Sequence, residues 1–321
     1  MPHPWIDLVV GGVSNPRFLC CSSELCSNTS FESNMNGWEH TAVGADIVRT
    51  VDPTTQFGNY SALISAYSGA SYYAYYNYAY GSSLAEKHIM VCFFAKGSTT
   101  STKIKVELKT VQTVVSLTAV GARTNPTVFT LNADTWTFIF VEGIVPVGNT
   151  STDVRLYLWP CDPTTDPYGS PPVVYTVSID KVTMRITELD YTLDVPHAMK
   201  HGFKKIKKTE VIRLDGEKRE SILGHRHTCS LEYELLDATD EAIRRQLKNF
   251  NNLFFFPHND VNWGYFALIG DIDSDYFHDK YVGHSGEIEL ESCLVFREGL
   301  GDLEEAIAQG VGGFGGDIFI G

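Results

Sequence analysis

The clearest alternation of hydrophobic and polar positions lies within residues 213–296. In its first part every second residue is apolar: Cys229, Leu231, Tyr233 and Leu235. Such alternation predicts a β-strand with one buried face. Apolar runs at 254–256, 265–269 and 288–296 predict further strands in the same region.

One helix is expected near 239–250, between these strands. Three apolar residues follow one another at i, i+4 and i+7 and form a stripe: Ile243, Leu247 and Phe250. The basic residues beside the stripe, Arg244, Arg245 and Lys248, are expected to point away from it. One helix packed on a small antiparallel sheet is the simplest fold for this region.

The first half of the chain carries short apolar strand patterns at regular spacing. They include a tyrosine-rich run at 71–80, runs at 90–96 and 154–159, and a last one at 174–182. Regularly spaced short strands are typical of a sandwich or jelly roll. We therefore expect a mainly β protein, in which a jelly-roll β-sandwich is followed by a second β-sandwich or split-barrel domain with one flanking helix.

The net charge of −14 argues against a nucleic-acid-binding protein. No apolar run approaches the roughly 20 residues of a membrane-spanning helix. The first residues lack the basic segment and the long apolar core of a signal peptide, so we expect none.

Basic residues are concentrated in one short segment, although the chain as a whole has a negative net charge. Five of them are candidate interface residues: Lys204, Lys205, Lys207, Lys208 and Arg213. Each by itself is most simply a solvated side chain, but as a group they fit an acidic neighbour in an assembly. A second candidate interface is the glycine-rich end of the chain, where Phe314, Ile318 and Phe319 are expected to dock on a partner protein.

The seven cysteines form no CxxC pair, so a zinc ribbon is not indicated. Three of them lie in apolar strand patterns and are predicted to be buried thiols: Cys92, Cys229 and Cys293. Cys20, Cys21 and Cys26 are close enough in sequence to form a local disulfide, and free thiols are the alternative.

In the second half of the chain, strands flank one helix, and the phrases Leu214-Asp215-Gly216 and Phe256-Pro257 accompany them. This arrangement resembles the β domain of bacteriophage tail proteins, the group that contains tail-tube, tail-terminator and distal-tail subunits. The resemblance covers about a third of the chain. It implies a homo-oligomeric ring in the tail of a virion, assembled in the host cytoplasm, with other virion tail proteins as partners.

Four short motifs occur in order between about residues 27 and 187: N-x-S-F-E followed by G-W, G-x-x-S-A-L, D-x-W and I-D-x-V. Together they resemble the jelly-roll carbohydrate-binding modules of xylanases and cellulases. In that family the Glu of the first motif and the Asp of the last hold a structural calcium ion, which implies Glu32 and Asp180 as ligands here. Lys181 stands where the family often has a second acidic residue. The alternative is two solvated carboxylates at strand ends.

Aromatic residues that could stack on sugar rings concentrate in residues 71–80 and beside the loop after 159. Alternation along a strand places Tyr76 and Tyr78 on one face and Tyr73 and Tyr75 on the other. We include these four tyrosines and Trp159, which is expected to be exposed, as candidate carbohydrate contacts. The alternative is that these rings only pack in the core or against a neighbouring subunit. The resemblance to the carbohydrate-binding modules implies that Trp38 and Trp136, which match mostly core positions of that family, lie in the core.

The chain is accordingly divided into an N-terminal arm (1–26), a carbohydrate-module-like jelly roll (27–187), a phage-tail-like β domain (188–300) and a docking tail with a short helix (301–321). We expect a structural, non-enzymatic subunit of a virion tail or tail tip that binds host surface glycans. A free carbohydrate-binding protein is the first alternative. A glycan hydrolase is the second, since paired carboxylates cannot be found from spacing alone.

Overall fold

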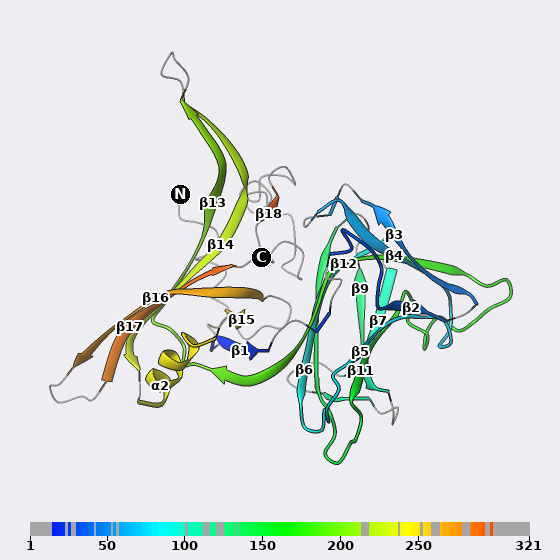
Figure 1. The fold of residues 1–321 in the computed structure, drawn as a ribbon, viewed down its shortest axis with the longest axis horizontal. Helices are drawn as coiled ribbons and strands as arrows, with labels where there is room; N and C mark the ends of the chain where they lie inside the picture. Colours follow the sequence, from blue (N-terminus) through cyan, green and yellow to red (C-terminus); the bar gives the residue numbers. More distant parts are fainter. Residues whose placement is uncertain are drawn as a thin grey trace. The chain divides into compact units, whose positions relative to one another are not determined.

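The computed structural model describes residues 15–297, except 23–24, 27–29, 42, 53, 56–57, 100–101, 112–115, 120–124, 132, 134, 213–217, 237, 251–252, 258–263, 278–282 and 293–295. The described chain is built mainly of β-strands with one helix, which confirms the predicted fold class (Figure 1). It forms two compact units. The jelly-roll unit comprises 22–188, and the C-terminal unit comprises 15–21 and 189–297.

The jelly-roll unit contains two antiparallel sheets. The first has the order β3-β4-β12-β6-β10-β8, and its strands are β3 (Ala45–Val51), β4 (Tyr60–Tyr67), β12 (Val174–Thr192), β6 (His88–Gly97), β10 (Thr137–Ile144) and β8 (Thr118–Ala119). The second has the order β2-β5-β11-β7-β9, and its strands are β2 (Trp38–His40), β5 (Ala74–Ala79), β11 (Asp153–Trp159), β7 (Thr102–Thr110) and β9 (Thr127–Leu131).

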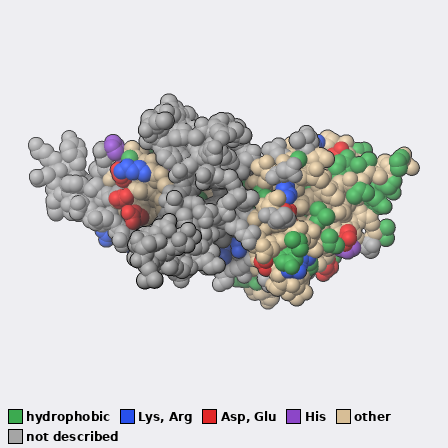
Figure 2. Space-filling model, turned by 90° about the horizontal axis from the view of Figure 1, so that it is seen from above, with side chains coloured by type: hydrophobic (Ala, Val, Ile, Leu, Met, Phe, Trp, Pro, Cys, Tyr) green, Lys and Arg blue, Asp and Glu red, His purple; other side chains and the backbone are tan. Residues whose placement is uncertain are grey.

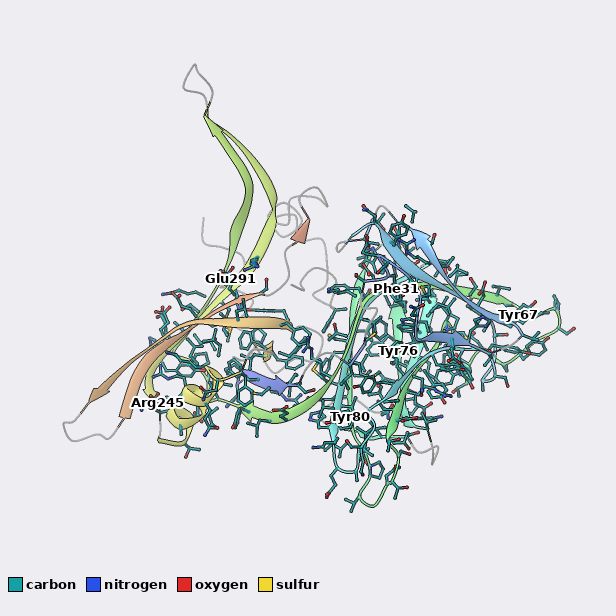
Figure 3. The ribbon with its side chains drawn as sticks, viewed as in Figure 1. Phe31, Tyr67, Tyr76, Tyr80, Arg245 and Glu291 are labelled. Carbon is teal, nitrogen blue, oxygen red and sulfur yellow. The ribbon has the colours of Figure 1, made fainter. Side chains whose placement is uncertain are left out.

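Both sheets bury one face in a common core, as their alternating sequences predict. From the second sheet, the core receives Leu156 and Leu158 of β11 and Val106 of β7, all fully buried. Phe31 and Tyr76 lie in the same interior, next to Trp38 (Figure 3). The predictions that Trp38 and Trp136 are core residues are confirmed, with exposed fractions of 7% and 6%.

The described strands of the C-terminal unit form one antiparallel sheet. Its order is β13-β14-β17-β16-β15-β1, with β18 (Phe296–Arg297) on β14, and its strands are β13 (Ala198–Ile212), β14 (Lys218–Leu236), β17 (Gly283–Ser292), β16 (Tyr265–Phe277), β15 (Leu253–Phe256) and β1 (Arg17–Cys21). The guanidinium of Arg17 donates two hydrogen bonds to the carboxylate of Asp190, at 2.9 and 2.6 Å. These bonds connect β1 to residues near 189, where the chain re-enters the C-terminal unit.

Helix α2 (Ala238–Leu247) packs on this sheet through the predicted stripe, in which Leu247 is fully buried and Ile243 and Phe250 are partly buried. Arg244, which was expected only to point away from the stripe, has a fully buried side chain. Its Nη2 lies 2.7 Å from Oε2 of Glu241, one turn earlier, and a buried charge is tolerated when it is paired in this way. Arg245 is exposed on the same helix (Figure 3).

The described cysteines are buried free thiols. They include Cys92 and Cys229, as predicted, and also the three N-terminal ones. Cys20 belongs to the core of the C-terminal unit and Cys26 to that of the jelly roll, so no local disulfide joins them in the structure. Within the described ranges, no helix is long and apolar enough to cross a membrane.

Candidate functional site

The outer face of the second jelly-roll sheet gathers aromatic and charged side chains. In β5, β11 and β7 the residues next to the core positions point to the opposite side. We call this surface the tyrosine face and define it by nine residues: Glu39, Tyr73, Tyr75, Lys105, Glu107, Lys109, Arg155, Tyr157 and Trp159.

Strand register sets the rows of this face. Tyr157 of β11 is opposite Tyr75 on one side and Glu107 on the other, and Glu39 of β2 continues the row beyond Tyr75. Arg155 is opposite Lys109 on β7. Because β11 is the middle strand of the sheet, Arg155 and Tyr157 lie at the centre of the tyrosine face.

The four rings of this face are packed against one another. Tyr157 and Trp159 are stacked with centroids 5.7 Å apart, and Tyr73 meets them at 5.1 and 5.2 Å. Tyr75 lies 6.0 Å from Tyr157. Since neighbouring rings support each other, they form a rigid platform and lose little conformational entropy when a ligand is bound.

Basic side chains lie over these rings. The Cζ atom of Arg155 is 4.3 Å from the centroid of Tyr75, and Nζ of Lys105 is 4.5 Å from that of Trp159. Nζ of Lys109 is 5.5 Å from the centroid of Tyr157, and all three distances fall within cation–π range.

Two acidic residues complete the tyrosine face. Glu107 is buried and lies 3.0 Å from Nζ of Lys109 and 3.9 Å from Nζ of Lys105. Glu39 accepts a hydrogen bond from the hydroxyl of Tyr75, and this bond, together with burial, raises the pKa of Tyr75 above its usual value. The hydroxyl therefore stays protonated and donates at neutral pH.

The structure places Tyr73 and Tyr75 together, half-buried, on the tyrosine face. The expectation of glycan contact is wrong for Tyr76, which is only 4% exposed. Tyr78 is partly buried and packs against the same core, so it does not belong to the tyrosine face. The expectation that Trp159 is exposed is wrong as well. Its indole nitrogen donates to the carbonyl oxygen of Ala70 at 2.9 Å, and its ring is covered by neighbours.

Sequence reasoning missed Arg155, Tyr157, Lys105 and Lys109 as members of the site. The alternation in 154–159 held enough information to place Arg155, Tyr157 and Trp159 on one face. Their meeting with Tyr73 and Tyr75 depends on the pairing of β11 with β5, which no local pattern specifies.

The two predicted calcium ligands lie in a carboxylate-rich part of the jelly roll. Asp180 is 1% exposed, and burial raises its pKa to about 8, with the charges of Glu32 and Asp52 acting in the same direction. One carboxylate oxygen accepts a hydrogen bond from the backbone N–H of Lys181 at 2.7 Å. The other, Oδ2, is buried and has no hydrogen-bond partner among the described residues.

Glu32 is held in a fixed position at the surface. Its Oε1 accepts hydrogen bonds from the backbone N–H groups of Asn59 and Tyr60 at 2.9 and 3.0 Å. A Cβ atom added to Gly58, which has φ +137°, would lie 2.0 Å from the same oxygen, so only glycine fits beside this carboxylate.

These groups fit a hard cation in part. The unpartnered oxygen of Asp180 and the oriented carboxylate of Glu32 are oxygen donors of the kind that calcium prefers. Asp52 is already engaged by Lys96, at 2.8 Å. Within the described ranges, no three His, Cys, Asp or Glu side chains gather closely enough to hold a metal, so backbone carbonyl oxygens would have to complete the site.

The predicted interface residues are only partly covered by the structure. The backbone of Lys204, Lys205, Lys207 and Lys208 belongs to β13, and Arg213 lies outside the described residues. The candidates of the chain's end, Phe314, Ile318 and Phe319, and the predicted helix after 301 also lie outside the described residues.

No family model and no curated protein matches the sequence. Several solved structures are similar to about half of the chain. A CBM22 xylan-binding domain from Paenibacillus barcinonensis is 11% identical with a TM-score of 0.38, over 53% of this chain and 98% of that one. The module-bearing endo-1,4-beta-D-xylanase of Clostridium thermocellum is 16% identical with a TM-score of 0.38, over 52% of this chain. The match spans only 28% of that xylanase.

The enzymatically active domain of tailspike protein 4 from bacteriophage CBA120 is 15% identical with a TM-score of 0.34, over 51% of this chain and 21% of that one. Identities and TM-scores this low do not establish membership of a family.

The raised pKa of the buried Asp180 predicts how the free energy of unfolding changes with pH when a chelator keeps divalent metals away. Because its pKa is raised from 3.8 to about 8, the folded state keeps a proton that the unfolded state loses. Stability should therefore fall as the pH rises from about 4 to about 8, by at most about 1.4 kcal/mol per pH unit from this group. Asp180→Asn should flatten this part of the profile, as measured by the melting temperature of the jelly-roll transition. An unchanged slope in the variant would contradict the assignment.

Proposed function

We propose that the jelly-roll unit binds a glycan through the tyrosine face. The observation that supports this most directly is the platform of four packed rings on one side of a sheet whose other side is core. Aromatic rings stack on the apolar faces of sugars, while hydroxyl and amino groups at their edges bond to sugar hydroxyls. Tyr73 and Tyr75, the less buried rings, are the proposed stacking contacts.

The position of the rings favours recognition over a purely structural role. Tyr76 and Tyr78 already supply the core from the same strand, so Tyr73 and Tyr75 are not needed to fill it. Figure 2 shows hydrophobic side chains gathered on part of the visible surface of this unit. Most of the large hydrophobic side chains that are exposed on this unit are valines, such as Val43, Val51 and Val147. The tyrosine face differs because its rings and charged groups are mutually ordered.

Replacement of both Tyr73 and Tyr75 by alanine should weaken polysaccharide binding by about tenfold or more, because two stacking surfaces are lost. Affinity electrophoresis and titration calorimetry against a panel of neutral and acidic polysaccharides would measure the change. Tyr168→Ala is the matched control, since Tyr168 is 55% exposed on the same unit but outside the tyrosine face. Equal binding by the double variant, with its fold intact by circular dichroism, would rule out this face.

We also propose a structural calcium ion at Asp180 and Glu32. When bound, a divalent cation would supply the positive charge that lets Asp180 ionise while buried. The unpartnered Oδ2 of Asp180 and the carboxylate that Asn59 and Tyr60 hold in place support the proposal.

Calcium should raise the melting temperature of the jelly-roll unit, and the increase should grow between pH 6 and pH 8 as the proton on Asp180 becomes easier to displace. Differential scanning calorimetry with calcium or chelator would show this. Asp180→Asn should abolish the increase, whereas Asp162→Asn, in a surface loop of the same unit, should not. A melting temperature that is the same with calcium and with chelator would count against the site.

We propose that the C-terminal unit makes the chain a ring-forming subunit of a phage virion tail or tail tip. The supporting observation is β13, a fifteen-residue strand that pairs only with β14 in the described part of the chain and is extended in Figure 1. An edge strand of this length offers unpaired backbone groups to a neighbouring copy. Four lysines in its sequence, Lys204, Lys205, Lys207 and Lys208, are the proposed contacts to other tail proteins.

Light scattering and electron microscopy of the purified chain should show rings, either alone or after addition of a virion tail partner. Replacing the four lysines of β13 by glutamine should reduce ring formation, because an acidic neighbour would lose its attraction. The same number of Lys→Gln changes on the jelly roll is the control. A persistent monomer that binds polysaccharide would favour a free carbohydrate-binding protein instead.

A further inference from the structure

The charges on the tyrosine face specify more about its ligand than the rings do. Three cations, Lys105, Lys109 and Arg155, lie over aromatic rings of this face. Two carboxylates, Glu39 and Glu107, lie among them. The face thus has an excess of one positive charge, in a chain whose net charge is −14.

Glu107 is largely occupied by its neighbours. It lies within ion-pair distance of both lysines and accepts a hydrogen bond from Oγ of Ser116 at 2.6 Å. Glu39 is bound to the hydroxyl of Tyr75. Glu107 thus pairs with the two lysines and Glu39 with Tyr75, and neither carboxylate forms an ion pair with Arg155 in the described part of the chain.

Arg155 has no carboxylate partner among the described residues. Its Nη1 donates to the hydroxyl of Tyr157 at 3.2 Å, and its Nε is buried without a hydrogen-bond partner in the same part of the chain. Oδ1 of Asn77, the residue opposite it on β5, is likewise buried and without a partner. The guanidinium thus has N–H donors that no protein carboxylate uses.

The rings also orient the guanidinium. Arg155 lies between Tyr75, at 4.3 Å, and Tyr157, at 5.6 Å, measured from Cζ to the ring centroids. A planar guanidinium held against ring faces loses less freedom when its N–H groups bind a planar anion in bidentate fashion. Arg155 also lies on the middle strand and so near the centre of the proposed binding face, and central contacts tend to dominate the affinity of an interface.

We propose, resting on glycan binding by this face, that its ligand is an acidic polysaccharide whose carboxylate pairs with Arg155. The sugar ring would stack on Tyr73 and Tyr75, and its carboxylate would accept hydrogen bonds from the Nη groups of the guanidinium. Lys105 and Lys109 would add longer-range attraction to further acidic units along the polymer.

Polygalacturonate and its fully methyl-esterified form test this, because they share a backbone and differ in charge. The full-length protein should bind the acid form about tenfold more tightly than the ester. Raising the salt concentration should weaken binding of the acid form only. Alginate, hyaluronate and a sulfated polysaccharide extend the acidic set, and xylan extends the neutral set.

Arg155→Gln should remove the preference for acid polymers, measured as the ratio of the dissociation constants for the acid and the ester form, whereas Arg245→Gln, an exposed arginine of the C-terminal unit, should leave this ratio unchanged. Equal binding of acidic and neutral polymers, or a preference that survives Arg155→Gln, would overturn this inference while glycan binding stands. Preference for sulfated over carboxylated polymers would overturn the assignment of the carboxylate. Binding to no member of either set would overturn the proposed glycan site itself.

Discussion

The alternation of side chains along β5, β7 and β11 is the constraint on which the jelly-roll unit depends. Each strand sends one set of residues into the core and the next set to the tyrosine face. A shift of register by one residue would exchange Leu156 with Tyr157 and destroy the core and the aromatic platform together. The stability of the sheet therefore protects the geometry of the candidate site, since both are fixed by one register.

Much of the fold follows from such patterns. The mainly β class and the helix stripe around Leu247 are visible in the sequence and present in the structure. The core positions of Trp38 and Trp136, which the family resemblance implied, are present as well. Arg244 departs from the amphipathic pattern of the helix, because its charged side chain lies away from the apolar stripe and is nevertheless buried, paired with Glu241. Burial of such a pair is decided by tertiary packing, which periodicity does not contain.

The candidate site was predictable only in part, for a related reason. The tyrosine-rich run pointed to the right strand, and alternation separated Tyr73 and Tyr75 from Tyr76. The run does not reveal which strands pair with it. Arg155 comes from β11, about eighty residues later, and Lys105 comes from β7. The covering of Trp159 depends on the carbonyl of Ala70 and on Lys105, and neither is adjacent in sequence. Long-range pairing thus decides which aromatic residues are accessible.

The cations above the rings also affect how the protein behaves toward its own copies. A bare platform of four aromatic rings would be a sticky surface on which molecules aggregate. Here the ammonium groups of Lys105 and Lys109 lie over Trp159 and Tyr157, and Tyr157 and Trp159 are only 8% and 4% exposed. Like charges then repel when two such surfaces meet. We therefore expect the side chains proposed for recognition also to keep these faces of two molecules from adhering to each other.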